Sequence, residues 1–190
     1  MEIASLFPTS VGIINDIITE KERTDLIETI KSKSCIHHQV FRGNGLSSHR
    51  TKNDFLSEDI LNRIQDSIDE YVETYGCTQQ KIENYWFNIQ EENSVLTEHT
   101  HGDATISGAL YLNVDDTCKL FFHNPNPYTY IIDKDPDKFT EFTYEYYWIS
   151  VKNCQLIIFP SWLKHGKNDV VNSMNNRIAI SFNTNKKSKD

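Results

Sequence analysis

The sequence predicts a mostly β fold, a sandwich or jelly roll with two helices packed on the outside of one sheet. From Ile82 onward, apolar and polar residues alternate in short runs that turn residues interrupt, which is typical of antiparallel strands. Before that point, apolar residues recur at helical spacing. Aromatic residues make up 12% of the chain, and this content favours strands.

Two stretches in the first part of the chain predict helices. The first covers residues 19–33, where Glu20 near the start and Lys31 near the end complement the helix dipole. The second begins after Ser57, a suitable N-cap, and stops at Gly76, because glycine readily ends a helix. The apolar stripe of this second helix consists of Ile60, Leu61, Ile64, Ile68 and Tyr71.

The remaining segments predict strands and loops. An apolar stretch at residues 6–14 predicts a strand, and the polar residues 35–54 predict a loop. Further strands are expected at residues 83–90, 97–101, 105–114, 119–123, 144–151, 154–160 and 177–184. Residues 124–142 are too many for an ordinary hairpin loop, so we expect a mobile insertion there, a candidate substrate lid.

Length and composition indicate one globular domain over residues 1–190. Within it we expect residues 1–80 to give helical N-terminal support and residues 81–185 to form the β core. The formal net charge of −8 argues against general nucleic-acid binding, which needs clustered cations. The sequence shows no signal peptide, no apolar stretch long enough to span a membrane, and no paired cysteine motif. These features predict a cytoplasmic protein that does not bind membranes.

A group of metal-ligand residue types stands at His99-Thr100-His101-Gly102-Asp103. Residues two apart on a strand point to the same face, so the side chains of His99, His101 and Asp103 could all lie on one face of a strand. Two histidines and one carboxylate on one face of an ion are typical of iron oxygenases. Alternatively, Gly102 and Asp103 form a turn that directs the carboxylate elsewhere, which would leave a three-histidine site.

A second group of candidate site residues lies nearer the C-terminus, where His165 follows one predicted apolar strand and Arg177 opens another. An arginine in an apolar strand needs an anionic partner, because burying an unpaired charge is costly. The distal carboxylate of 2-oxoglutarate would form such a bidentate pair, and an internal Asp or Glu is the alternative partner.

Several motifs together resemble the 2-oxoglutarate and iron(II)-dependent dioxygenase superfamily, in particular a small phage and bacterial branch related to prolyl hydroxylases. The motifs are Leu6-Phe7-Pro8-Thr9, the segment from His99 to Leu112, Phe122-His123-Asn124-Pro125, and the segment from Phe159 to His165. The resemblance covers essentially the whole chain and is strongest over residues 86–183.

The resemblance implies a double-stranded β-helix with a metal between its two sheets. His101 and His165 fall on metal-ligand motifs, whereas the third ligand is Asp103 by the superfamily pattern or His99 by the branch pattern. Arg177 corresponds to the clamp for the 2-oxoglutarate carboxylate. Tyr111 corresponds to a tyrosine that supports the same carboxylate in prolyl hydroxylases.

By the same resemblance, the chain is a hydroxylase that needs Fe(II), O2 and 2-oxoglutarate and releases succinate. Its substrate would be peptidyl-prolyl or a small molecule, and it would work in the host cytoplasm if the chain comes from a phage. Two alternatives are a non-catalytic β-sandwich that binds another molecule, and a cupin-type dioxygenase that uses three histidines without a 2-oxo acid.

Other aromatic and polar residues are weaker candidates for the site. We expect Trp86, Asn88 and Trp162 to be core or pocket wall and His123 to lie at a strand end. The remaining histidines, His37, His38 and His49, lie in the predicted loop and could reach a site only if that loop folded over it.

Overall fold

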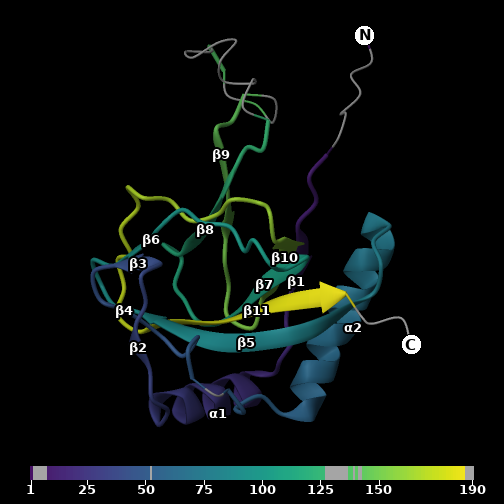
Figure 1. Cartoon of the computed structure of the whole chain (residues 1–190). Helices are drawn as coiled ribbons and strands as arrows, with labels where there is room; N and C mark the ends of the chain where they lie inside the picture. Colours follow the sequence, from purple (N-terminus) through teal and green to yellow (C-terminus); the bar gives the residue numbers. More distant parts are fainter. Residues whose placement is uncertain (2–7, 52, 127–136, 139, 141–142, 187–190) are drawn as a thin grey trace.

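The protein consists of a large antiparallel sheet with smaller strand pairs on one face and two helices on the other (Figure 1). The computed structural model describes residues 1, 8–51, 53–126, 137–138, 140 and 143–186. The large sheet has seven strands, in the order β1 (Gly12–Ile14), β10 (Leu156–Pro160), β7 (Ile106–Asn113), β11 (Arg177–Lys186), β5 (Gln80–Gln90), β4 (Gly45–Ser47) and β2 (Ile36–His37).

Two strand pairs lie over the face of the large sheet that is opposite the helices. One consists of β8 (Lys119–His123) and β9 (Tyr146–Ser150), and the other of β3 (Phe41–Arg42) and β6 (Val95–Leu96). Apolar side chains of β8 pack against those of β7 and β10 in a second core cluster, which includes Leu120, Phe122, Tyr111, Ile157 and Phe159. This packing gives the two-layered β structure that the sequence predicts.

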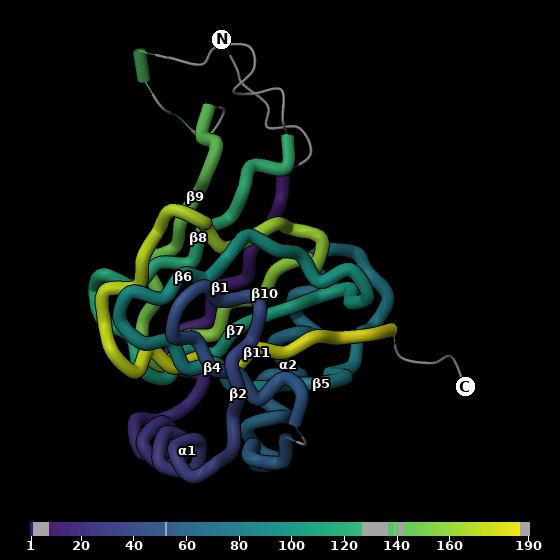
Figure 2. The backbone as a smooth tube through the Cα atoms, turned by 60° about the vertical axis from the view of Figure 1, so that its left-hand side comes forward, coloured from purple at the N-terminus to yellow at the C-terminus, as the bar shows by residue number. Residues whose placement is uncertain are grey.

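Both predicted helices are confirmed. Helix α1 (Glu20–Lys31) begins after Thr19, whose side chain and that of Glu22 form a reciprocal capping box. Helix α2 (Glu58–Tyr75) begins after Ser57 and ends at Gly76, which adopts a left-handed φ of 70°. The two helices cover one face of the large sheet (Figure 2).

The pleat of the large sheet separates structural from site side chains. On β11, Ile178, Ile180 and Phe182 belong to the core cluster beneath the helices. The alternate residues Arg177, Ala179 and Ser181 line a cavity on the opposite face. The same alternation on β5 places Phe87 in the core and Trp86 and Asn88 in the cavity wall.

The prediction of a loop at residues 35–54 is wrong, because β2, β3 and β4 lie there. These strands have two or three residues each and exist through pairing with distant partners, such as Ser47 of β4 opposite Asn88 of β5. Strands of two or three residues are too short for the sequence to show an alternation of apolar and polar residues.

The predicted strand at residues 97–101 is also different from what is observed. Strand β6 ends at Leu96, and beyond it His99 forms an isolated bridge with His165. The expected strand at residues 6–14 corresponds in its described part to β1, and most of the insertion at residues 124–142 lies outside the described residues. None of the described helices is long and apolar enough to cross a membrane.

Candidate metal centre

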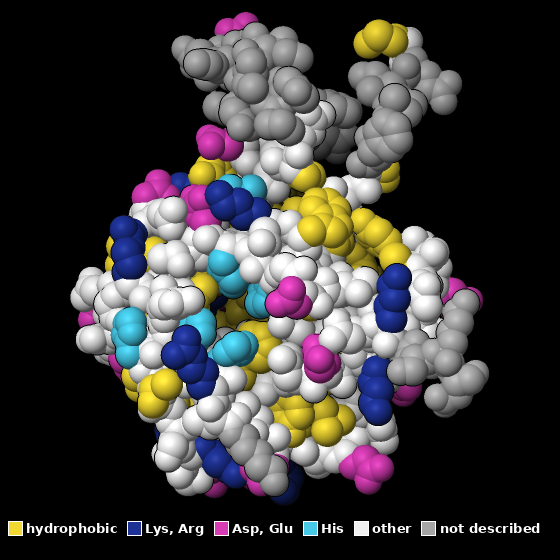
Figure 3. All heavy atoms as spheres, viewed as in Figure 1, with side chains coloured by type: hydrophobic (Ala, Val, Ile, Leu, Met, Phe, Trp, Pro, Cys, Tyr) yellow, Lys and Arg dark blue, Asp and Glu magenta, His cyan; other side chains and the backbone are white. Residues whose placement is uncertain are grey.

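Histidine side chains surround a hollow on one face of the molecule (Figure 3). The hollow is the mouth of a cavity of about 630 Å³ that reaches the large sheet. Five histidines line the cavity: His38, His49, His99, His101 and His165. The lining contains no Asp, Glu or Lys, and its one permanently charged side chain is Arg177.

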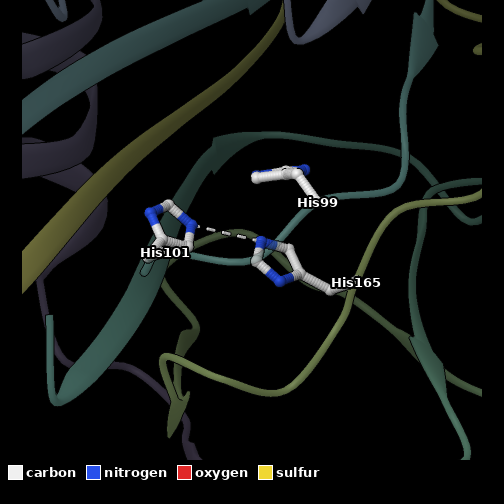
Figure 4. A group of neighbouring side chains, drawn as sticks. All are labelled: His99, His101 and His165. Carbon is white, nitrogen blue, oxygen red and sulfur yellow. Dashed lines mark hydrogen bonds between the residues drawn. The ribbon is translucent and has the colours of Figure 1, made fainter. Parts of the chain in front are cut away.

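Three of these histidines converge on one point from two segments of the chain (Figure 4). One ring nitrogen from each of His99, His101 and His165 can be chosen so that all three lie within 4.8 Å of one another. The Nε2 atoms of His101 and His165 are 3.4 Å apart. Two nitrogens that each lie about 2.1 Å from one ion, roughly at a right angle, are about 3 Å apart, so the spacing suits a shared metal.

Backbone hydrogen bonds bring the two segments together. The N–H of His99 donates to the carbonyl of His165 at 2.9 Å, and the N–H of His165 donates back at 3.0 Å. The N–H of His101 donates to the carbonyl of Ser161 at 3.0 Å. The Ser161 hydroxyl is buried and lies 2.8 Å from that of Ser107. The triad is therefore anchored to the ends of β7 and β10.

Two of the rings are also fixed in orientation. The Nδ1 of His99 lies 2.8 Å from the Thr97 carbonyl, and the Nδ1 of His165 lies 3.0 Å from the Leu163 carbonyl. A carbonyl oxygen only accepts, so each Nδ1 must carry the proton and each Nε2 keeps a free lone pair. This is the arrangement that metal-binding imidazoles commonly adopt.

The protein keeps these imidazoles uncharged. Burial lowers the pKa of His99 and lowers the pKa of His165 well below its usual value. Burial, together with the nearby His99 and His49, lowers the pKa of His101 to about 4. Neutral imidazole is the form that binds a metal, so the protonation state of the triad suits metal binding at neutral pH.

Asp103 does not join this group. The chain turns at Gly102 and Asp103, so the two-residue alternation ends at His101 and the Asp103 side chain is exposed. His123 is separate too, with its Nε2 3.1 Å from the Gly166 carbonyl and 3.7 Å from the Glu98 carboxylate.

Arg177 and Tyr111 line the same cavity as the triad. Arg177 is 9% exposed, and its guanidinium lies 6.0 Å from the centre of the Tyr111 ring. The guanidinium donates to the Lys119 carbonyl at 3.3 Å, and within the described residues it forms no ion pair with a carboxylate. Burial raises the pKa of Tyr111 to about 12, so its hydroxyl stays protonated.

The cavity wall includes further residues that the sequence indicates only weakly. His38 and His49 reach the cavity because β2 and β4 pair onto the edge of the large sheet. The His49 ring stands at 89° to that of Trp86, with centroids 4.6 Å apart. Trp86 and Asn88 line the cavity, whereas Trp162, expected in the core or pocket wall, is 53% exposed. The sequence feature that indicates a role for these residues is the clustering of three histidines within residues 37–49.

Solved structures with the same fold include several 2-oxoglutarate enzymes. A prolyl-4-hydroxylase from Pseudomonas putida has a TM-score of 0.65 at 10% identity, covering 95% of this chain and 94% of its own. HygX from Streptomyces hygroscopicus, solved with nickel and 2-oxoglutarate, has a TM-score of 0.60 at 8% identity over 94% and 83%. The collagen prolyl hydroxylase of Paramecium Bursaria Chlorella virus-1 has a TM-score of 0.56 at 15% identity over 92% and 95%. The double-stranded β-helix fold is thereby confirmed.

Sequence comparison gives the family. No curated protein matches the chain. A family model described as "Putative 2OG-Fe(II) oxygenase" matches residues 84–183, which include the triad, Tyr111 and Arg177. The match spans more than half of the chain, and the chain belongs to this family of 2OG-Fe(II) oxygenases.

Proposed function

We propose that the protein hydroxylates a small-molecule or peptide substrate, with His99, His101 and His165 holding Fe(II) and with Arg177 and Tyr111 binding the distal carboxylate of 2-oxoglutarate. The observation that carries this proposal is the content of one cavity: three convergent neutral imidazoles and a buried guanidinium without a carboxylate partner among the described residues. A buried cation of this kind needs an anion, and 2-oxoglutarate supplies one.

The donor set fits iron in kind and in placement. Imidazole nitrogen is a suitable donor for Fe, Zn, Cu and Ni. All three rings border the cavity, so positions facing the cavity stay open to other ligands. When bound there, iron with 2-oxoglutarate and O2 supplies the oxidising power, as 2-oxoglutarate is decarboxylated to succinate.

The remaining residues orient and shield the reactants. The guanidinium of Arg177 can form two parallel hydrogen bonds with a carboxylate, and the protonated Tyr111 hydroxyl can donate a third. Apolar side chains of Val40, Phe41 and Phe159 line the same cavity and limit the access of water.

Two kinds of substrate are supported by the named structural relatives. The Pseudomonas and chlorella virus proteins are prolyl hydroxylases, and HygX has also been solved with hygromycin B bound. The cavity of about 630 Å³ can hold 2-oxoglutarate together with part of a substrate.

A dioxygenase that uses three histidines without a 2-oxo acid is the second candidate. The third nitrogen donor, His99 in place of a carboxylate, favours it. Arg177 opposes it, because without a 2-oxo acid this buried guanidinium would have no carboxylate partner among the described residues. Binding of 2-oxoglutarate separates the two candidates, since a ligand that binds only the native state raises the melting temperature.

The test combines binding with turnover. Protein reconstituted with Fe(II) without oxygen is expected to melt at a higher temperature with 2-oxoglutarate, and to form succinate once oxygen is admitted. Arg177→Ala should remove the thermal shift and reduce succinate formation by about tenfold to 100-fold, because charged hydrogen bonds are lost. Arg42→Ala is the matched control, since Arg42 is an exposed cation that donates to the Asn168 carbonyl. An unchanged shift and rate in Arg177→Ala would overturn the assignment.

A further inference from the structure

The mouth of the cavity is bordered by an unusually cationic part of an acidic chain. The protein has 27 acidic and 19 basic residues, yet residues 29–53 contain no Asp or Glu. The same stretch contains Lys31, Lys33, Arg42, Arg50, Lys52, His37, His38 and His49, of which Lys33 pairs with Asp54 just beyond it. A local excess of positive charge against an opposite overall balance indicates recognition of an anion.

The fold brings one end of this stretch directly to the cavity. Strand β4 pairs with β5 so that Ser47 lies opposite Asn88, and the chain then turns at His49 and Arg50. The rings of His38 and His49 are 5.3 Å apart in an edge-to-face arrangement. We call Arg50, His38 and His49 the mouth cluster.

The mouth cluster is separated from the triad by one aromatic ring. His49 contacts Trp86, and the Trp86 ring centroid lies 6.1 Å from that of His101. The rings of Trp86 and His101 both line the cavity, so a ligand held at the mouth can extend along Trp86 to the triad.

Arg50 is the permanently charged side chain that acts on both histidines of the cluster. Burial lowers the pKa of His38, and the nearby His49 and Arg50 lower it further. Burial is the main cause that lowers the pKa of His49, and the nearby charge of Arg50 lowers this pKa further. No carboxylate contributes to either pKa, and no acidic side chain lines the cavity. The acidic side chains seen in Figure 3 lie across the hollow from part of its histidine rim.

The cluster also provides suitable donors. The Val40 N–H donates to Nδ1 of His38 at 3.2 Å, so in the neutral ring Nε2 carries the proton and can donate. Arg50 is exposed and offers the planar guanidinium that pairs with phosphate or carboxylate oxygens. These groups are not needed for 2-oxoglutarate, whose carboxylate is assigned to Arg177 under the proposed function.

We propose that the substrate carries an anionic group, a phosphate or a carboxylate, which binds at Arg50, His38 and His49 while the carbon to be oxidised extends past Trp86 to the triad. This inference rests on the proposed function, in which 2-oxoglutarate occupies the inner end of the cavity. It predicts two anion sites in one cavity, one for the co-substrate and one for the substrate.

The test uses protein loaded with Ni(II) and 2-oxoglutarate, so that Arg177 is occupied and no turnover occurs. Isothermal titration with phenyl phosphate, benzoate and the neutral benzamide measures the affinity for each probe. At least one anion is expected to bind, and benzamide is expected to bind much more weakly. Which anion binds more tightly distinguishes a phosphate-bearing substrate from a carboxylate-bearing one.

Variants locate the binding. Arg50→Gln should weaken anion binding by about tenfold or more, the loss expected for charged hydrogen bonds. His49→Asn should also weaken it. Arg42→Gln removes an equal charge from the same acid-free stretch and should have little effect, because Arg42 contributes to the pKa of neither mouth histidine.

Three results would overturn the inference: no binding of either anion to the wild-type protein, equal binding by Arg50→Gln, or displacement of the anion by added 2-oxoglutarate. The last result would place the anion at Arg177. Failure of the proposed function is visible separately, because the Ni(II)-loaded protein would then not bind 2-oxoglutarate before any probe is added.

Discussion

His99 and His165 exchange both of their backbone hydrogen bonds across an isolated antiparallel bridge, at 2.9 and 3.0 Å. The bridge lies outside every regular strand, yet it places two candidate metal ligands side by side, with ring centroids 4.2 Å apart. Two residues that are distant in the sequence thus have their relative position fixed by the main chain.

The identity of the third ligand gives the first prediction. His99→Ala should weaken Fe(II) binding at least about 100-fold, because it removes a nitrogen donor from the triad. Asp103→Asn should leave the affinity nearly unchanged, because the Asp103 side chain is exposed outside the triad. Competition with a chelating dye without oxygen measures both affinities, with the exposed His37→Ala as control. Equal losses in the two variants would identify Asp103 as a ligand.

An ion pair beside the histidine bridge gives the second prediction. Glu98 and Lys164 precede the two bridged histidines, and their charged groups are 2.7 Å apart. We expect Glu98→Gln to reduce metal affinity about fivefold, because the pair helps to hold the two segments together and such partly exposed pairs contribute at most about 1 kcal/mol.

A double-mutant cycle with Lys164→Met separates this coupling from the loss of either charge alone. The exposed Lys21–Asp25 pair on α1, with its charged groups 2.8 Å apart, is the control and should not affect metal affinity. Additive effects of Glu98→Gln and Lys164→Met on metal affinity would show that the pair does not position the ligands.

Glu22 gives a prediction about pH and stability. Hydrogen bonds from Arg63 and from the Thr19 backbone lower the pKa of Glu22 to about 2, from an ordinary value of 4.5. The folded state therefore binds this proton less readily than the unfolded state, so its stabilising effect is complete above pH 4.5 and is lost as the pH falls toward 2. Glu22→Gln keeps a capping-box acceptor and removes the charge.

We expect Glu22→Gln to lower the free energy of unfolding by about 1 kcal/mol at pH 7, an amount discounted for solvent screening. The difference from wild type should shrink between pH 4.5 and pH 2 in urea titrations. A difference that stays constant across this range would mean that the charge of Glu22 is not responsible.

A buried hydroxyl network beneath the triad gives the fourth prediction. The Ser107 hydroxyl donates to the Asn183 side chain at 2.7 Å and lies 2.8 Å from the Ser161 hydroxyl. Ser107→Ala leaves those partners unsatisfied and should cost about 1–3 kcal/mol of stability, measured by denaturant unfolding. Metal affinity should fall as well, because the Ser161 carbonyl holds the His101 backbone. Ser67→Ala on α2 is a control with a hydroxyl bonded only to its own helix. Stability equal to that of the control would contradict a supporting role.

The elements with local signals could be predicted from the sequence. Helix α2 has a capping serine, an apolar stripe and a terminal glycine within a single segment, and it forms where expected. The alternation of β11 likewise indicated that Arg177 opens an apolar strand. In each case the deciding interactions lie within the segment itself, so its sequence contains them.

The features that depend on distant partners could not be predicted. Strands β2, β3 and β4 exist because they pair with other strands, and only this pairing brings His38 and His49, in the loops beside β2 and β4, to the cavity. Whether His99 or Asp103 joins His101 depends on where the extended chain turns, and both geometries suit the same five residues. Trp162 has a large aromatic side chain of a kind common in cores, yet it is exposed.

The division of β11 between two faces has a consequence for how this fold can change. Ile178, Ile180 and Phe182 hold the strand against the helix-side core, whereas Ala179 and Ser181 line the cavity, where Ala179 also packs against the second core cluster. Substitutions at such cavity positions alter the shape available to a substrate while the packing beneath the helices is preserved. New substrate preferences can therefore arise by exchange of side chains on one surface, with little loss of the stability on which the scaffold depends.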